Sequence, residues 1–144
     1  MIIETSFVPG EPRIAYDQAG AGDIVLFLHG IGGNRTNWRD QLPTFSKNYQ
    51  AIAWDARGYG ESDDYVGPLN FGEFARDIVR LLDHLEAATA HIVGLSMGGR
   101  IALDFVARFP ERIKTLTLSG TRASFAQRTE AERDEFVRLR KKPL

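Results

Sequence analysis

The sequence predicts an α/β fold: a three-layer sandwich around a mostly parallel sheet, with an antiparallel hairpin on its N-terminal side. Strand-like apolar runs alternate with helical patterns of roughly ten or more residues, which is typical of βαβ units. The run IVLFL at residues 24–28 is continuously apolar, as expected of a strand that is covered on both faces. At the front, residues 2–8 and 13–18 look like two strands joined by the turn residues PGEP, which predicts the hairpin.

The next two elements precede a long loop. Residues 37–49 predict a short helix whose N-cap is Asn37 or Thr36. Residues 50–55 (QAIAWD) predict a second buried strand, and a loop rich in glycine and aspartate follows it.

Two longer helices and two strands complete the predicted sheet. Asn70 and Glu73 have the spacing of a capping box. The apolar stripe after them consists of Phe74, Ile78, Leu81, Leu82 and Leu85. Residues 91–95 (HIVGL) predict a strand, and residues 113–120 predict the last one. Between these strands a second helical stripe, stopped by Pro110, consists of Ile101, Ala102, Phe105, Val106 and Phe109.

The composition argues against several functional classes. A formal net charge of −1 gives no strong field toward nucleic acid or an anionic membrane. The chain has no cysteine, which excludes a disulfide scaffold and thiolate metal sites, and its histidines have no metal-binding spacing. The first residues lack the basic start and long apolar run of a signal peptide. We therefore expect a cytoplasmic protein with no metal, no cofactor and no nucleic-acid or membrane partner.

Polar loops follow three predicted strands, after Leu28, Trp54 and Leu95. Ligands of open α/β sheets bind beyond the carboxyl ends of the strands, so we expect the functional site at these loops. The third connection is very short, because the strand that ends at Leu95 meets a helix at Ser96.

Ser96 has the context of a nucleophile on a sharp turn between a strand and a helix. The helix begins at Met97, and the partial positive charge at its N-terminus favours a developing oxyanion. Gly94 and Gly98 flank the serine, as needed where the strand and helix backbones approach each other. This G-x-S-x-G pattern in its strand–turn–helix context predicts a nucleophile elbow. The alternative is a serine that only caps the helix.

The loop HGIGGN at residues 29–34 is the candidate for oxyanion stabilisation. Acyl transfer needs two N–H donors that converge on one oxygen. Met97 supplies one donor, and the glycine-rich loop that starts at Gly30 can supply the N–H of Ile31. The alternative is a turn that only requires glycine.

The loop DARGYGESD at residues 55–63 does not fit a dinucleotide site. Asp63 stands where the third glycine of that motif belongs, and no helix begins there. We expect Asp55 and Arg57 to hold this loop in place by hydrogen bonds.

The motifs HGIGGN, DARGYGESD and GLSMGG, in this order and at these intervals, resemble the α/β-hydrolase superfamily. The likeness is strongest to its branch of esterases, 3-oxoadipate enol-lactonases and cofactor-free haloperoxidases, and it covers essentially the whole chain. It implies that Ser96 is the nucleophile and that the N–H groups of Ile31 and Met97 form the oxyanion hole. The supporting residues that it implies are His29, Gly30, Gly94 and Gly98. The serine at the elbow argues against a haloalkane dehalogenase, which has an aspartate there.

The triad of this fold runs in the order serine, acid, histidine, but every histidine of this chain precedes Ser96. In relatives, the position of His29 shapes the oxyanion loop and does not act as the base. His84 lies in a predicted helix, and His91 begins the strand that ends at the elbow, so neither is expected near the serine.

We therefore predict residues 1–122 as the N-terminal part of an α/β-hydrolase core, through its sixth strand, and residues 123–144 as the helical start of a cap. The remaining core strands and the catalytic histidine and acid have no counterpart here. We expect a second polypeptide or a C-terminal half to supply them, which would also cover the apolar edge of the last strand. The isolated chain is then expected to be inactive.

The predicted function is hydrolysis of a carboxylic ester or lactone by Ser96. One alternative is a catalytically incomplete half-domain that binds a small molecule or assembles with a partner. Another is acyl transfer or perhydrolysis by the same triad. Trp38, Tyr59 and Phe125 are candidates to line the pocket, although each also fits a core position.

Overall fold

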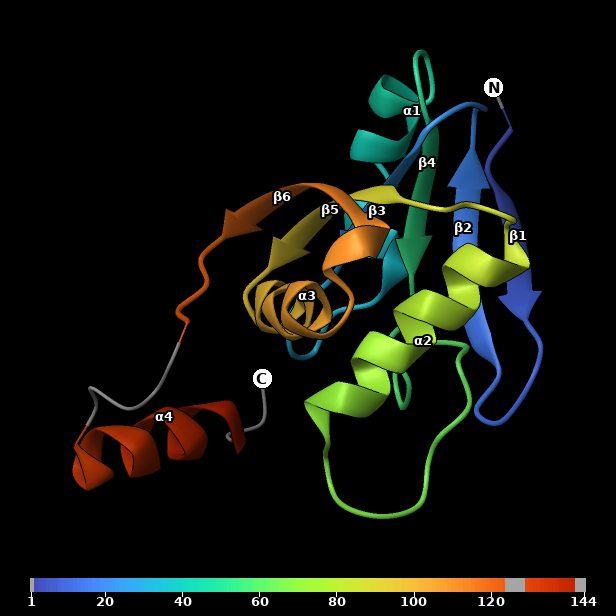
Figure 1. Ribbon diagram of the computed structural model, residues 1–144. Helices are drawn as coiled ribbons and strands as arrows, with labels where there is room; N and C mark the ends of the chain where they lie inside the picture. Colours follow the sequence, from blue (N-terminus) through green and yellow to red (C-terminus); the bar gives the residue numbers. More distant parts are fainter. Residues whose placement is uncertain (1, 124–128, 142–144) are drawn as a thin grey trace.

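The computed structural model describes residues 2–123 and 129–141 and contains a six-stranded sheet in the order β1-β2-β4-β3-β5-β6 (Figure 1). The strands are β1 (Glu4–Val8), β2 (Ile14–Ala19), β3 (Ile24–Leu28), β4 (Gln50–Trp54), β5 (Ala90–Leu95) and β6 (Ile113–Ser119). β1 pairs antiparallel with β2, and β2 pairs antiparallel with β4. The other pairings are parallel. The predicted hairpin and mostly parallel sheet are confirmed.

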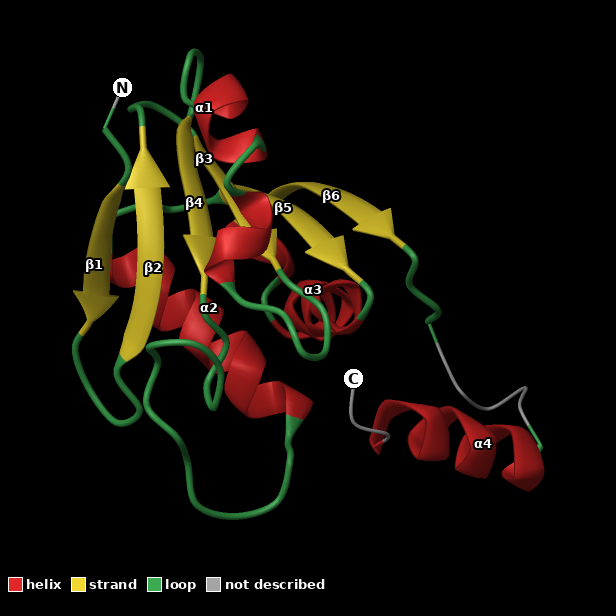
Figure 2. Cartoon of the chain, turned by 180° about the vertical axis from the view of Figure 1, so that it is seen from behind, coloured by secondary structure: helices red, strands yellow, loops and turns green. Residues whose placement is uncertain are grey.

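Helices cover both faces of the sheet, which gives the predicted three layers (Figure 2). α2 (Phe71–His84) and α3 (Met97–Arg108) pack on one face. The short helices η1 (Arg35–Trp38) and α1 (Gln41–Phe45) pack on the other, against the alternate side chains of β3 and β4. A short 3-10 turn, η2 (Pro110–Arg112), leads into β6.

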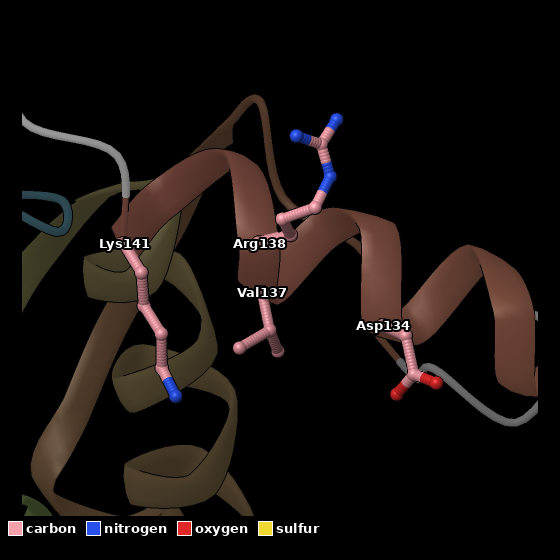
Figure 3. Close-up of a pocket in the computed structure, with 4 residues that line it drawn as sticks. All are labelled: Asp134, Val137, Arg138 and Lys141. Carbon is pink, nitrogen blue, oxygen red and sulfur yellow. The ribbon is translucent and has the colours of Figure 1, made fainter.

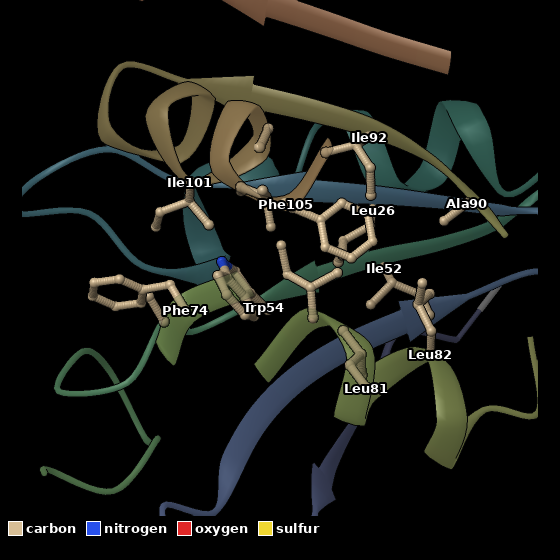
Figure 4. Close-up of a cluster of buried hydrophobic side chains, with 14 of the residues drawn as sticks. Leu26, Ile52, Trp54, Phe74, Leu81, Leu82, Ala90, Ile92, Ile101 and Phe105 are labelled. Atoms are coloured by element: carbon tan, nitrogen blue, oxygen red, sulfur yellow. The ribbon is translucent and has the colours of Figure 1, made fainter. Parts of the chain in front are cut away.

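The larger of the two apolar clusters lies between the sheet and the pair α2 and α3 (Figure 4). Its members include Leu26, Trp54, Phe74, Ile78, Leu81, Leu82, Ile101 and Phe105, each at most 1% exposed. Both predicted apolar stripes therefore face this core. Burial of these side chains is the main force that fixes the ends of β3, β4 and β5 relative to one another.

The helix predicted over residues 37–49 is wrong in its start and its continuity. The structure has the 3-10 turn η1 followed by the separate helix α1, and the N-cap is Asn34. The Asn34 side chain accepts from the N–H of Thr36 at 2.9 Å, and the Asn37 side chain accepts from the N–H of Asn34 at 2.8 Å. Asn37 is thus the reciprocal partner inside the turn, so neither it nor Thr36 is the cap.

The predicted N-cap of α2 is confirmed, but its reciprocal partner is not the one expected. The Asn70 side chain accepts from the N–H of Gly72 at 2.8 Å. Glu73 instead forms an ion pair with Arg76 at 2.6 Å.

β6 and the tail differ from the rest of the molecule in their exposure. β6 pairs with β5 along one edge, and most of its side chains are exposed. The tail contains helix α4 (Glu130–Lys141), which lies to one side of the sheet and is exposed along most of its length (Figure 1). The helix expected in this region is present, whereas its assignment to a cap stays a prediction.

Candidate active site

Ser96 alone connects strand β5 to helix α3. Its backbone has φ 52° and ψ −112°, in the left-handed half of the map that a residue with a Cβ rarely adopts. The residue is exposed, and its side chain makes no capping hydrogen bond to α3. Ser96 occupies the N-cap position of α3 without the side-chain hydrogen bond that a capping serine supplies, which argues against a serine that only caps the helix. The strained turn predicted from the sequence is present, and it leaves Ser96 exposed where β5 ends.

The two glycines that flank the serine are required by close backbone contacts. A Cβ on Gly94 would lie 2.5 Å from the Cα of Gly99, in the first turn of α3. A Cβ on Gly98 would overlap the carbonyl of Leu28 and lie 2.7 Å from the carbonyl oxygen of His29. The strand β5, the helix α3 and the end of β3 can meet at Ser96 only because these positions lack side chains.

The structure brings the predicted oxyanion loop against Ser96. A Cβ on Gly30 would lie 3.3 Å from Ser96 Cβ and 3.9 Å from Ser96 Oγ. The N–H of Gly33 donates to the carbonyl of Gly30 at 3.1 Å and closes a tight turn around Ile31. Met97 is the first residue of α3, so its N–H has no partner within the helix. The convergence of the Ile31 and Met97 N–H groups on one oxygen stays a prediction.

His29 lies beneath this loop as a structural residue. Its ring is fully buried, and Nε2 accepts from the N–H of Ala56 at 3.1 Å. Nδ1 therefore carries the proton and donates to the carbonyl of Gly30 at 2.8 Å. Burial lowers the pKa of His29 and keeps the ring neutral. With both nitrogens engaged, His29 joins the start of the oxyanion loop to the residue that follows β4.

The far end of the loop is held by a buried carboxylate at the end of β4. Asp55 is fully buried and accepts from the backbone N–H of Arg35 at 2.7 Å and from its guanidinium at 2.5 Å. Arg35 also contacts Asp17 at 2.9 Å and Glu61 at 2.7 Å. Burial alone would lower the pKa of Arg35, but these carboxylates raise it. Asp55 also accepts from the N–H of Glu61 at 2.8 Å, and its carbonyl accepts from the hydroxyl of Ser62 at 2.6 Å, so its expected role in holding the loop over residues 55–63 is confirmed.

Arg57 has the same kind of role on the opposite side. Its guanidinium donates two hydrogen bonds to the fully buried carboxylate of Asp77 on α2, at 2.6 and 2.9 Å. This pairing raises the pKa of Arg57. The ion pair of Arg57 with Asp77 therefore fixes the loop over residues 55–63 to α2, whereas Asp55 fixes the oxyanion loop.

The sequence and structure of this chain were compared with those of known proteins. The family model described as "alpha/beta hydrolase fold" matches residues 23–141. The chain belongs to the alpha/beta hydrolase fold family. The resemblance based on the three motifs is thereby confirmed.

Curated relatives and solved structures of this family are longer than this chain. It is 35% identical over 109 residues to the putative carbamate hydrolase RutD of Azorhizobium caulinodans, with 76% of this chain and 41% of that protein covered. It is 33% identical over 103 residues to 3-oxoadipate enol-lactonase 2 of Acinetobacter baylyi, with 72% and 39% covered. A thermophilic esterase from Thermogutta terrifontis matches with a TM-score of 0.76 and 35% identity over 84% of this chain and 45% of that one. The chain spans about two fifths of the length of the two curated relatives.

The three histidines of this chain all lie within the described residues, so their surroundings can be compared with those of Ser96. Besides His29, its histidines are His84, whose ring lies 6.2 Å from that of Tyr16, and His91, which contacts Thr115 Oγ1 at 2.7 Å. His91 lies at the start of β5, whereas Ser96 follows its end. In the structure each of the three histidines contacts residues other than Ser96.

The candidates for the pocket wall have different surroundings. Trp38 packs on Phe27 in the smaller apolar cluster, with ring centroids 5.0 Å apart. Tyr59 lies at the site: its ring is 5.0 Å from that of His29, and its hydroxyl donates to Met97 Sδ at 3.6 Å. Phe125 lies outside the described residues.

A pocket of about 420 Å³ lies against α4 and is lined by Asp134, Val137, Arg138 and Lys141 (Figure 3). None of the described residues that line it is predicted for the active site.

Two contributors to the site were not found from the sequence, Arg35 and Gly99. Arg35 acts on residues 18 and 20 positions away, and no local pattern indicates such a contact. The two adjacent glycines at the end of GLSMGG could have indicated the role of Gly99. Glycine is needed at this position because a Cβ there would overlap the side chain of Thr121. Among the described residues, no helix is both long enough and apolar enough to cross a membrane.

Proposed function

We propose that this chain carries the nucleophile and oxyanion hole of a serine hydrolase that acts on carboxylic esters or lactones. The observation that carries the proposal is the strained, exposed turn at Ser96 with the Gly30 loop packed against it. Strain of this kind persists only where the surrounding structure holds it, and it is concentrated at functional sites. Relatives named as an enol-lactonase and an esterase support the substrate class.

In the proposed reaction, Ser96 Oγ attacks the carbonyl carbon and gives its proton to a base. The N–H groups of Ile31 and Met97 stabilise the oxyanion of the tetrahedral intermediate. Collapse of the intermediate expels the alcohol, which takes up the proton, and leaves an acyl-serine. Water then attacks the acyl group with the same base, releases the acid and restores the serine. No cofactor is required for these steps.

The base and the acid that orients it are proposed to come from outside these 144 residues, in a C-terminal half or on a second polypeptide. The surroundings of the histidines support this part of the proposal, since His29 and His91 have hydrogen-bond partners and the ring of His84 packs near that of Tyr16. A serine hydroxyl is a weak nucleophile without an adjacent base. The isolated chain is therefore proposed to react slowly, and residues 123–144 are proposed to begin the cap that shapes the substrate pocket.

Covalent labelling of Ser96 tests the proposal. The 144-residue chain is treated with a fluorophosphonate, with and without added imidazole as a substitute base, and its intact mass is measured. We expect one adduct, formed faster with imidazole and absent in Ser96→Ala. Ser119→Ala is the matched control, since it removes a neighbouring exposed hydroxyl and should keep the adduct.

Either outcome of this experiment is informative. A second mass in the untreated sample would identify a partner polypeptide. If no adduct forms at Ser96 under any condition, the proposed nucleophile is wrong, and the half-domain that binds a ligand or partner becomes the better explanation. Product analysis with competing acceptors then separates hydrolysis from acyl transfer or perhydrolysis.

A further inference from the structure

The end of β6 and the segment that follows it contact both backbone polar groups of Ser96. The N–H of Ser96 donates to the carbonyl of Ser119 at 2.8 Å. The hydroxyl of Thr121 lies 3.0 Å from the carbonyl oxygen of Ser96 and 3.2 Å from that of Ser119. A hydroxyl has one proton to donate. The shorter contact is the one to Ser96, and either donation keeps Thr121 against the strained turn.

The segment after β6 also packs closely on the first turn of α3. A Cβ on Gly99 would overlap the side chain of Thr121, so the helix and the segment touch only because this position is glycine. The next side chain of α3, Arg100, donates to the carbonyl of Ala123. The segment from the end of β6 to Ala123 therefore runs along the turn at Ser96 and the first turn of α3.

These contacts matter because the backbone conformation of Ser96 is unfavourable and needs support from neighbouring groups. Its φ of 52° is unfavourable for a residue with a Cβ, and its side chain makes no capping bond that would compensate. The carbonyl of Ser96 also accepts from the N–H of Arg100 at 3.1 Å, as the first bond of the helix. Thr121 adds a second donor from another element, which ties the direction of that carbonyl to the sheet.

We propose that Thr121 is a positioning residue for the nucleophile, which fixes the backbone of Ser96 through its hydroxyl. The inference rests on the proposed function, in which Ser96 attacks the substrate. Thr121 does not touch the reacting atoms. Its role is to keep Ser96 Oγ directed at the substrate carbonyl and the N–H of Met97 directed at the oxyanion. Small displacements of such groups cost reaction rate.

Two substitutions at this position separate the hydroxyl from the bulk of the side chain. Thr121→Val keeps the shape and removes the donor, and Thr121→Ser keeps the donor. Thr115→Val is the matched control, because Thr115 lies near the other end of β6 and its hydroxyl contacts His91 at 2.7 Å. All three are made in the 144-residue chain, and thermal unfolding is recorded for each.

The first readout is amide hydrogen exchange at Ser96, followed by NMR, which does not depend on reactivity. Thr121→Val is expected to speed exchange at this N–H by about fivefold, as for the loss of one hydrogen bond, while Thr121→Ser and Thr115→Val change it by less than about twofold. The second readout is the rate of fluorophosphonate labelling with imidazole, which should fall by a similar factor in Thr121→Val and recover in Thr121→Ser.

The two readouts distinguish the two proposals. Unchanged exchange at Ser96 in Thr121→Val, or an equal increase in Thr115→Val, would show that Thr121 does not position the turn. If amide exchange at Ser96 is faster in Thr121→Val but the unsubstituted chain is not labelled, the positioning role of Thr121 is supported and the proposed nucleophile is rejected. Faster exchange with unchanged labelling would limit Thr121 to a structural role and overturn the inference.

Discussion

Two buried arginines, Arg35 in η1 and Arg57 after β4, have similar surroundings but serve different parts of the molecule. Each is 8% exposed, and each pairs with a fully buried aspartate, at 2.5 Å for Arg35 with Asp55 and 2.6 Å for Arg57 with Asp77. Asp55 also binds the backbone at the end of the oxyanion loop. Asp77 belongs to α2 and is shared with Arg80, which donates to two carbonyls near the β1–β2 turn.

The comparison shows that burial and charge pairing do not by themselves mark an active site. What distinguishes the Arg35 cluster is its place in the chain, because Arg35 directly follows the loop that packs on Ser96. His29 ties the other end of that loop to Ala56, one residue beyond Asp55. We therefore expect both clusters to stabilise the fold, and only the Arg35 cluster to affect the reactivity of Ser96.

The largest expected effect comes from neutralising the two aspartates. Asp55→Asn and Asp77→Asn should each lower the free energy of unfolding by about 3 kcal/mol or more, because a buried arginine loses its partner. Chemical denaturation measures this loss. Labelling of Ser96 at a temperature where both variants are folded should slow only in Asp55→Asn. Equal slowing in both variants would remove the distinction between the clusters.

Two glycines of the loop after β4, Gly60 and Gly58, allow the same comparison with a smaller expected effect, because only Gly60 lies against Asp55. Gly60 and Gly58 both have positive φ, 51° and 79°, so alanine at either position costs roughly 1–2 kcal/mol of strain. A Cβ on Gly60 would also overlap the carboxylate of Asp55, whereas one on Gly58 would lie 3.2 Å from the ring of Tyr65. Thermal unfolding should therefore show a larger loss for Gly60→Ala, and only this variant should label more slowly.

The pH dependence of stability tests the His29 end of the loop. Burial lowers the pKa of His29 below its ordinary value of 6.5, so the unfolded chain takes up the proton first as the pH falls. The free energy of unfolding should decrease from about pH 6.5 downward, until the folded protein is protonated as well. His29→Gln should remove this component, although it lowers stability at every pH. Urea titrations across this pH range measure the free energy of unfolding. If this free energy changes with pH equally in the unsubstituted chain and in His29→Gln, the prediction is contradicted.

The smallest effects are expected from the exposed carboxylates at the rims of the two clusters. Glu61 lies 2.7 Å from Arg35 with a side chain 59% exposed, and Glu73 lies 3.7 Å from Arg57. Solvent screening limits Glu61→Gln to less than about 1 kcal/mol and leaves Glu73→Gln near zero. Denaturation at low and high salt checks this, since the Glu61 contribution should shrink as salt is added. A loss comparable to that of Asp55→Asn would place Glu61 inside the cluster rather than at its rim.

Local sequence patterns predicted those parts of the site that depend on neighbours in the chain. The turn at Ser96 and its flanking glycines, Gly94 and Gly98, could be found because the strand, the turn and the helix are consecutive. The cap at Asn34 was missed because Asn34, Thr36 and Asn37 all suit a helix start, and only the folded backbone selects among them.

The sequence by itself determined the alternation of strands and helices, the two apolar stripes, the elbow serine and the absence of a histidine after it. These properties depend on periodicity and on residues a few positions apart. The tertiary structure decided which distant groups hold the site: Asp55 with Arg35, His29 with Ala56, and Thr121 with Ser96. Those contacts arise when the parallel strands bring their carboxyl ends to one edge of the sheet, where segments far apart in the chain become neighbours.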